Sequence, residues 1–179
     1  MSWFENQLQN RNYLSPIGFK FVLDKAPKTV FLCQSATIPG ISMGSPEQPS
    51  PFKKIPLSGD VVYEDLTVNF LVDENLENYL EIHNWVKSIS AADEFQRYTN
   101  FLDASEIKNG IRSFTSDGTM MVLTSNYAYN FQIRYADLFP ISISSLEFNV
   151  GGADIEYFTA SATFRYTIYT IENMIGEEQ

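Results

Sequence analysis

The sequence has few of the residues that disulfide frameworks and metal centres need. It contains one cysteine, Cys33, and one histidine, His83, among 179 residues. A single cysteine forms no disulfide within the chain, and a single imidazole cannot make a zinc site alone. One histidine also gives a Ser-His-Asp triad little support. We therefore expect no metal, no cofactor and no enzymatic activity.

Basic residues are also scarce. Twelve Lys and Arg face 22 Asp and Glu, so the formal charge is −10. This balance argues against phosphate-backbone binding as the main activity, because such binding depends on neutralisation of phosphates by Lys and Arg. No apolar run approaches the roughly 18 residues of a membrane span, and the first residues lack the basic and apolar regions of a signal peptide. We expect a protein that is kept in a reducing interior or exported only as part of something larger, without membrane contact.

Aromatic residues, in contrast, are abundant: 14 Phe and 10 Tyr, which favour half-buried sheets. Apolar and polar residues alternate over several stretches, as in strands with one buried face. The stretches with this pattern are 18–24, 29–36, 66–72, 119–124, 128–138, 145–150 and 155–171. A turn at 25–28 predicts that the stretches 18–24 and 29–36 form a hairpin. Phe139-Pro140 predicts an interruption of the strand pattern, and 151–154 has the residues of a hairpin turn. The last stretch is longer than a usual strand, which suggests that it either crosses from one sheet to another or extends beyond its own domain.

The segment 58–89 combines a turn, a strand and a helix without a spacer. Ser58-Gly59-Asp60 has turn chemistry, and the strand 66–72 follows. Asp73 stands where a helix N-cap belongs. Apolar residues then recur at steps of three and four, which predicts a helix lying on an apolar surface. The predicted fold is mainly β: an antiparallel β-barrel or sandwich of two packed sheets with one flanking α-helix.

The predicted organisation is one β domain over 18–171 with additions. Residues 1–17 form an N-terminal arm, and 172–179 form an acidic C-terminal tail. Within the domain, 41–56 is a Pro-rich extended loop and 90–113 is an insertion. A Pro-rich loop this long is unusual in a compact domain unless it has a function. Of the two interpretations, a surface excursion and a loop that reaches a neighbouring copy, we favour the second.

Several stretches, in this order, resemble one protein family. They are VFLCQSATIP (30–39), PLSGD (56–60) with DLTVN (65–69), Asp73-Glu74 followed by a helix up to Trp85, LFPISISSLEF (138–148) and 154–166. The order and spacing of these stretches resemble the tail-tube proteins and tube-like baseplate proteins of contractile-tailed, myovirus-type bacteriophages.

The resemblance implies a structural role in a virion. In that family six copies form a ring, and rings stack into a hollow tube through which DNA passes. It implies self-association, contact with other tail, sheath or baseplate proteins, transient non-sticking contact with viral DNA, and assembly in the host cytoplasm. Two alternatives remain open: a baseplate-hub, tube-initiator or tail-terminator ring of the same fold, and, more remotely, a monomeric β-barrel binding module.

Three groups of residues are candidates for function. Inter-subunit contacts are predicted for Trp3, Phe4, Leu8, Pro46, Pro49, Pro51 and Phe52. The core and the seat of the helix are predicted to contain Leu66, Phe70, Tyr79, Trp85, Phe158, Phe164 and Tyr166. Candidate residues for a lumen face are Thr159, Ser161 and Thr163.

Overall fold

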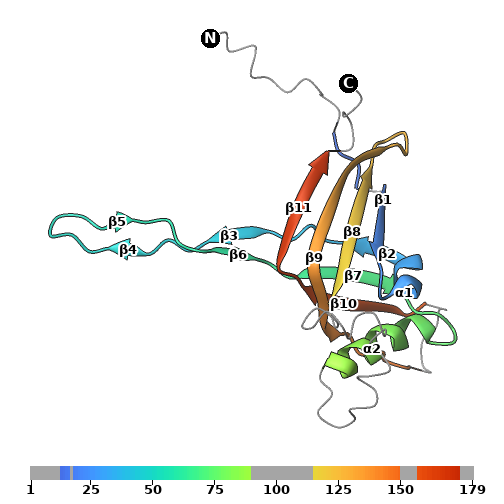
Figure 1. Ribbon diagram of the computed structural model, residues 1–179. Helices are drawn as coiled ribbons and strands as arrows, with labels where there is room; N and C mark the ends of the chain where they lie inside the picture. The colour runs from blue at the N-terminus through green and yellow to red at the C-terminus, as the bar shows by residue number, and fades with distance from the viewer. Residues whose placement is uncertain (1–12, 17, 90–114, 150–156, 174–179) are drawn as a thin grey trace, which may run out of the picture.

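The computed structural model describes residues 13–16, 18–89, 115–149 and 157–173. Most of the regular structure in these residues is β-strand (Figure 1). The strands are β1 (Phe19–Leu23), β2 (Cys33–Ala36), β3 (Ile41–Met43), β4 (Glu47–Gln48), β5 (Ile55–Pro56), β6 (Val61–Tyr63), β7 (Leu66–Leu71), β8 (Ser116–Leu123), β9 (Tyr129–Ile143), β10 (Thr159–Arg165) and β11 (Ile168–Asn173). The helices are α1 (Pro27–Phe31) and α2 (Glu77–Ile89).

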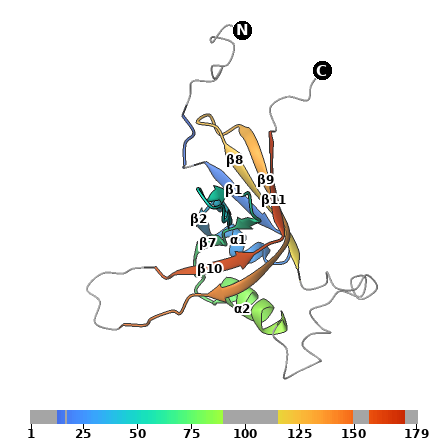
Figure 2. The ribbon, with the colours of Figure 1, turned by 90° about the vertical axis from the view of Figure 1, so that its left-hand side faces the viewer.

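The strands form two packed antiparallel sheets, which confirms the predicted fold class. The pairing order is β1-β8-β9-β10-β7-β2, and β11 pairs with β9. We call β1, β8, β9 and β11 sheet A, and β10, β7 and β2 with the end of β9 sheet B. Figures 1 and 2 show that the two sheets run in different directions. Within the described residues β1 and β2 do not pair with each other, so the two sheets do not close into a barrel.

Strand β9 joins the two sheets because it belongs to both. Its first part pairs with β8 and β11, and its last part, from Phe139, pairs with β10. Asp137 has a φ of 56° at the change of sheet, in the left-handed region that Asp tolerates better than most residues. The predicted interruption at Phe139-Pro140 is wrong: Pro140 lies opposite Phe164, where the register shifts. Proline fits such an irregular position because it has no N–H to donate.

The core lies between the sheets and α2. The strand β7 alternates as predicted, with Leu66, Val68 and Phe70 buried. From α2, the Trp85 ring lies 6.2 Å from that of Phe164 on β10. The buried residues of sheet A belong to the same cluster: Phe21, Leu23, Met120, Val122, Ile133, Tyr135 and Leu138.

The predicted strand over 29–36 is wrong in its first half. Residues 27–31 form α1, with Pro27 in the first turn, where its missing N–H costs nothing. The Thr29 hydroxyl donates to the Asn78 carbonyl at 2.9 Å, and the Thr29 N–H donates to Glu81 Oε2 at 3.0 Å. The predicted hairpin is also wrong, because β1 pairs with β8 and β2 pairs with β7.

The start of the long helix differs from the prediction. Helix α2 begins at Glu77, and Asp73 belongs to the preceding turn, where its carboxylate accepts from the Asn75 N–H at 3.3 Å. Asn78 fixes this turn to the sheet: its Oδ1 accepts from the Asp73 N–H at 3.1 Å and its Nδ2 donates to the Leu71 carbonyl at 2.7 Å. Asn78, five residues after Asp73, therefore holds the turn that connects β7 to α2.

The C-terminal alternation is two strands rather than one. β10 lies in sheet B and β11 in sheet A, so the chain crosses between sheets at Tyr166-Thr167, as the length of the pattern suggested. The described residues 144–149 contain no strand, contrary to the prediction for 145–150, and 151–154 lies outside the described residues. Glu172, assigned to the acidic tail by the sequence, belongs to β11.

Replacing the residue at the seat of the helix tests this packing. Trp85 is 1% exposed, so Trp85→Ala should lower the free energy of unfolding by about 3–5 kcal/mol. Urea denaturation followed by circular dichroism measures the change. The exposed Lys87→Ala on the same helix is the control, and we expect it to change stability by no more than about 0.5 kcal/mol. Equal losses for both variants would contradict the assignment of Trp85 to the core.

Candidate assembly interface

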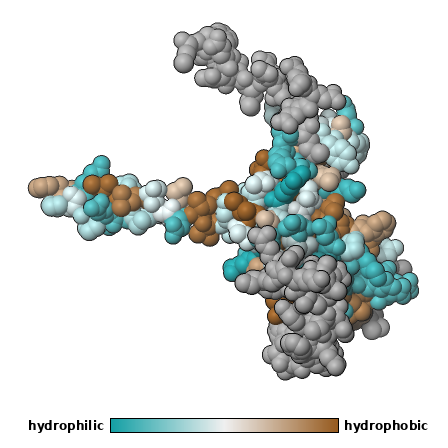
Figure 3. All heavy atoms as spheres, in the orientation of Figure 1, coloured by the Kyte–Doolittle hydropathy of each residue, from teal (hydrophilic) through white to brown (hydrophobic). Residues whose placement is uncertain are grey.

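Residues 41–62 form a long two-stranded arm that projects away from both sheets (Figure 1). β3 pairs with β6 near the base and β4 pairs with β5 near the tip. The arm carries many exposed apolar side chains, visible as brown patches in Figure 3. They are Ile41, Met43, Phe52, Ile55, Leu57, Val61 and Val62. Because an isolated hairpin is only marginally stable in water, such a surface is typical of a segment that packs on a partner.

The predicted turn at Ser58-Gly59-Asp60 lies inside the arm and does not reverse the chain. The Gly59 N–H donates to the Gly44 carbonyl at 2.8 Å, and the Gly44 N–H donates to the Asp60 carbonyl at 3.1 Å. A Cβ at Gly59 would lie 2.6 Å from the Gly44 carbonyl oxygen, a distance that would force the backbone to move. Gly59 is therefore required for the close approach of the two arm strands.

Four tyrosines gather at the base of the arm. We call Tyr63, Tyr135, Tyr166 and Tyr169 the tyrosine cluster. The Tyr166 ring lies 5.2 Å from Tyr135 and 5.9 Å from Tyr169, and the Tyr63 ring lies 5.6 Å from Tyr169. Edge and tilted pairs at these separations are each favourable beyond simple burial. The cluster thus joins the last arm strand, β6, to β9 and β11.

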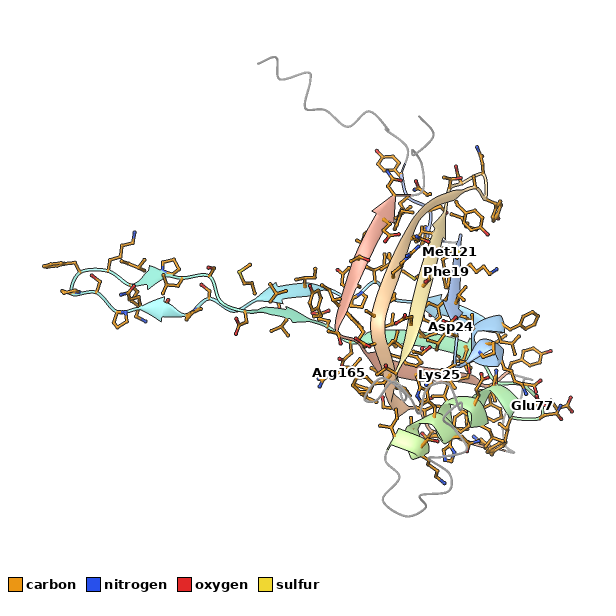
Figure 4. The ribbon with its side chains drawn as sticks, in the orientation of Figure 1. Phe19, Asp24, Lys25, Glu77, Met121 and Arg165 are labelled. Atoms are coloured by element: carbon orange, nitrogen blue, oxygen red, sulfur yellow. The ribbon has the colours of Figure 1, made fainter. Side chains whose placement is uncertain are left out.

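Hydrogen bonds fix both ends of the arm to the same place. The Tyr166 hydroxyl donates to the Glu64 carbonyl at 2.8 Å, and the Tyr169 hydroxyl donates to the Pro39 carbonyl at 3.2 Å. Beside them Arg165 Nε lies 3.0 Å from Asp65 Oδ1, and Figure 4 shows Arg165 where the arm meets the sheets. The direction of the arm is therefore set by contacts with β10, β11 and the link between them.

Burial within the cluster changes the tyrosine pKa values. Burial, with smaller contributions from Tyr169 and the carboxylates of Asp65 and Glu64, raises the pKa of Tyr166 to about 12. Burial also raises the pKa of Tyr135, which is 1% exposed. The Tyr135 hydroxyl has no hydrogen-bond partner among the described residues. Both hydroxyls therefore stay protonated at any ordinary pH.

The residue types that we examined for metal binding and catalysis are dispersed in the described part of the chain. They contain no group of three metal-ligating side chains. Burial raises the pKa of the Cys33 thiol to about 11, which makes it a poor nucleophile at neutral pH. The letters G-x-S-x-G do occur, at 40–44, but Ser42 is paired with Val62 in the arm and not on a strand-to-helix turn. Among the described helices, none is long and apolar enough to cross a membrane.

The predicted contact residues fall into two groups. Pro46, Pro49, Pro51 and Phe52 lie on the outer half of the arm, and Phe52 is 99% exposed. Trp3, Phe4 and Leu8 lie outside the described residues.

The predicted core residues also divide. Leu66, Phe70, Trp85 and Phe164 are buried, and Tyr79 and Tyr166 pack against the core from its margin. Phe158 is a correction: it precedes β10 and is 36% exposed, and its ring lies 4.8 Å from that of Phe148, which is itself exposed, and not in the core.

The candidate lumen residues Thr159, Ser161 and Thr163 lie on the face of β10 away from the core. There Ser161 is opposite Asn69 and Thr163 is opposite Thr67 on β7, so this face of sheet B is polar.

Sequence reasoning missed two features near the interface: the tyrosine cluster, whose members are far apart in the chain, and α1. Pro27 at the start of a short polar-apolar segment was the available signal for α1.

A tyrosine-to-phenylalanine change tests the contacts at the base of the arm. Tyr166→Phe removes one hydrogen bond and should lower the free energy of unfolding at pH 7 by about 1 kcal/mol. The raised pKa gives stability that is fully present below the unfolded-state pKa of about 10 and is lost as pH rises toward 12. The free energy of unfolding between pH 8 and 12 should therefore fall less steeply with pH for Tyr166→Phe than for the wild type. The remaining loss comes from other groups whose pKa is raised in the folded state, including Tyr135, Cys33 and Lys28. Tyr127→Phe, at an exposed turn, is the control, and identical slopes for all three proteins would refute the assignment.

Comparisons with known proteins identify a family and several similar folds. The family model of the phage tail tube protein matches residues 9–172. The fold is similar to that of the anti-feeding prophage (AFP) tube terminating cap, with a TM-score of 0.65 and 14% identity, over 97% of this chain and 99% of that chain. It is also similar to a chain of the sheath-tube complex of an extracellular contractile injection system (PVC), with a TM-score of 0.64 and 12% identity, over 92% of this chain and 94% of that chain.

A third similar structure is a chain of the AFP baseplate, with a TM-score of 0.61 and 9% identity, over 91% of this chain and 97% of that chain. At these identities the likeness is one of fold. The comparison with curated proteins yields no match. The match of the family model, which covers most of the sequence, shows that the chain belongs to the phage tail tube protein family.

Proposed function

We propose that this chain is a virion structural protein that forms a hexameric ring in a phage tail and lines a channel for DNA. The observation that carries the proposal is the pair of open edges of sheet A. Among the described strands, β1 pairs only with β8 and β11 pairs only with β9. Exposed strand edges are usually covered in native proteins, and an edge of another copy covers them without a new element.

The directions of these strands suit such a ring. β1, β8, β9 and β11 are successively antiparallel, so β1 of a second copy added beside β11 would continue the antiparallel order. A contact between two different edges is head-to-tail, and head-to-tail contacts close into rings when the rotation fits. The number six comes from the family resemblance.

The arm fits the same contact. In Figure 1 it leaves the molecule on the side of β11, whereas β1 and α1 lie on the opposite side. A neighbour placed beside β11 would therefore meet the arm as well as the strand edge. This supports an inter-subunit role for Pro46, Pro49, Pro51 and Phe52.

In a ring built from sheet A, the face of this sheet away from the core would line the channel. Register places Lys20, Met121, Gln132 and Glu172 in one row across that face, and Val22, Thr119, Arg134 and Thr170 in the next. Gln132 Nε2 donates to Glu172 Oε2 at 2.6 Å, and Arg134 Nε lies 3.3 Å from the same oxygen. Glu172 thus partly neutralises Arg134, one of the two basic side chains in these rows, which suits a wall along which DNA slides. Thr159, Ser161 and Thr163 would then face outward, toward sheath or neighbouring rings.

A second candidate is a single ring of the same fold at a tail end or in the baseplate. The similarity to the AFP tube terminating cap spans nearly the whole of both chains and favours this alternative. The similarity to the chain of the sheath-tube complex favours the repeating tube subunit to the same extent. The two candidates differ in whether rings of one protein stack on one another.

Removing the arm tip tests the ring. Deletion of residues 45–54 removes β4 and the tip but leaves the pairing of β3 with β6, so the domain should fold with an unchanged circular dichroism spectrum. We expect the deleted protein to remain monomeric at concentrations where the full chain forms rings, as measured by sedimentation velocity. Rings formed equally well by both proteins would refute the role of the arm.

Imaging across a concentration series separates the two candidates. Negative-stain micrographs of the full chain should show stacked rings that lengthen with concentration for a repeating tube subunit. Single rings that never stack would indicate a cap, terminator or baseplate component. A protein that stays monomeric, alone and with other tail proteins, would overturn the ring.

A further inference from the structure

We propose that a hollow beside α1 is the seat for the arm tip of a neighbouring copy. The hollow has a volume of about 500 Å³ and lies between α1 and the start of α2. It is lined by Pro27, Lys28, Phe31, Leu32, Asp73, Glu77 and Asn78. This inference rests on the proposed ring, and it adds the position on the partner at which the arm binds.

Phe31 leaves an exposed apolar surface beside this hollow in the single chain. Its side chain is 86% exposed although it belongs to a helix that packs on α2 and β1. A second hollow of about 430 Å³, bounded by β1 and Cys33, lies beside the first, and Phe31 lines both. An exposed aromatic side chain between two hollows is a typical anchor point of a protein interface.

The tip of the arm has the matching chemistry. Phe52 is 99% exposed, and Lys53 and Lys54 follow it. The tip segment 49–54 contains two basic residues and no acidic residue, in a chain with a charge of −10. Lys54 Nζ pairs with Glu47 at 2.8 Å, while Lys53 makes no ion pair among the described residues. The tip therefore presents one aromatic ring and one uncompensated cation.

The hollow has the opposite charge. Its rim holds two carboxylates, Asp73 and Glu77, and one cation, Lys28, which lies 2.6 Å from Glu77. Asp73 is left as the net negative group, and Glu74 lies next to it in the chain. An arm tip seated here would place Phe52 against Phe31 and Lys53 near Asp73, with both apolar and charge complementarity.

The positions of the two surfaces allow contact only between different copies. Figure 1 shows the tip of the arm and α1 on opposite sides of the molecule, and Figure 4 shows Glu77 on the side away from the arm. From Gly40 to Phe52 the arm has twelve residue steps, which span about 40 Å at roughly 3.3 Å per residue. Such a reach takes the tip across the flank of the next subunit, past the β1 edge that the proposed ring covers.

Cross-linking between chosen cysteines tests the seat directly. In a Cys33→Ser background, Pro51→Cys at the tip and Lys28→Cys at the hollow should be joined between chains by a short bismaleimide. The expected result is a ladder of covalent multimers that ends at the ring. The control replaces Lys28→Cys by Tyr127→Cys on the exposed β8–β9 turn, and it should give few or no multimers.

The outcomes separate the seat from the ring. Rings without cross-links, or cross-links equally frequent with Tyr127→Cys, would overturn the α1 seat and leave the ring in place. Cross-linked open chains without rings would support the seat and overturn the ring. Neither rings nor cross-links would overturn both.

A double-mutant cycle adds a second measurement. Phe52→Ser and Phe31→Ser should each raise the concentration needed for half-maximal ring formation by about tenfold, the effect of losing an interface anchor. In the proposal the aromatic side chains of Phe52 and Phe31 contact each other. The double variant should therefore raise the concentration for half-maximal ring formation by much less than the hundredfold expected for independent sites. Full additivity would place the two side chains in separate contacts and overturn the seat. Tyr127→Ser is the control and should leave assembly unchanged.

Discussion

The two sheets share the strand β9, and this shared strand determines much of the remaining geometry. Because β9 changes sheet near Asp137, where φ is 56°, sheet B is turned relative to sheet A at a fixed corner. The chain makes a second crossing between the same sheets at Tyr166-Thr167, and the N–H of Thr167 donates to the Ala136 carbonyl at 3.0 Å. The two crossings thus meet at one corner. β1 and β11 are left as the outer strands of sheet A on either side of it.

The same corner carries the arm. Three members of the tyrosine cluster, Tyr135, Tyr166 and Tyr169, come from the two crossings, and the fourth, Tyr63, comes from the arm itself. The hydroxyl groups of Tyr166 and Tyr169 satisfy the carbonyls at the two ends of the arm, which would otherwise have no partner in a neighbouring strand. The arm has little contact with the sheets beyond its base, so its direction depends on this small set of aromatic and hydrogen-bond contacts.

The sequence predicted the elements whose pattern is local and failed where the chain depends on distant partners. The alternation of β7 and the apolar stripe of α2 indicated which side chains are buried, because one face of each element meets the core. The segment 29–36 alternates equally well, but Thr29 bonds to Asn78 and Glu81 on α2, contacts that no local pattern contains. Phe139-Pro140 looked like a strand end for a similar reason: the register shift that accommodates Pro140 belongs to its pairing with β10.

The interface was partly predictable for the same reasons. Proline spacing indicated that 41–56 leaves the sheets, but not that it returns along itself as a hairpin as far as residue 62. The place of the tyrosine cluster required the topology, since Tyr63 and Tyr169 are more than a hundred residues apart. The hollow beside α1 could not be expected from a sequence in which α1 itself was taken for a strand.

The position of the arm and α1 on opposite flanks has a kinetic consequence for assembly. When each subunit offers a different surface to its left and right neighbours, every intermediate short of the full circle has one unsatisfied arm and one empty flank. The last inter-subunit contact forms between the two ends of one open oligomer, at an effective concentration far above that of free subunits. In the proposed hexameric ring, closure would therefore be all-or-none: dimers to pentamers would be transient, and the population would pass from single subunits to complete rings over a narrow range of concentration. Such closure would limit unspecific association, because the exposed apolar surfaces of the arm and of the α1 flank would be covered almost as soon as association begins.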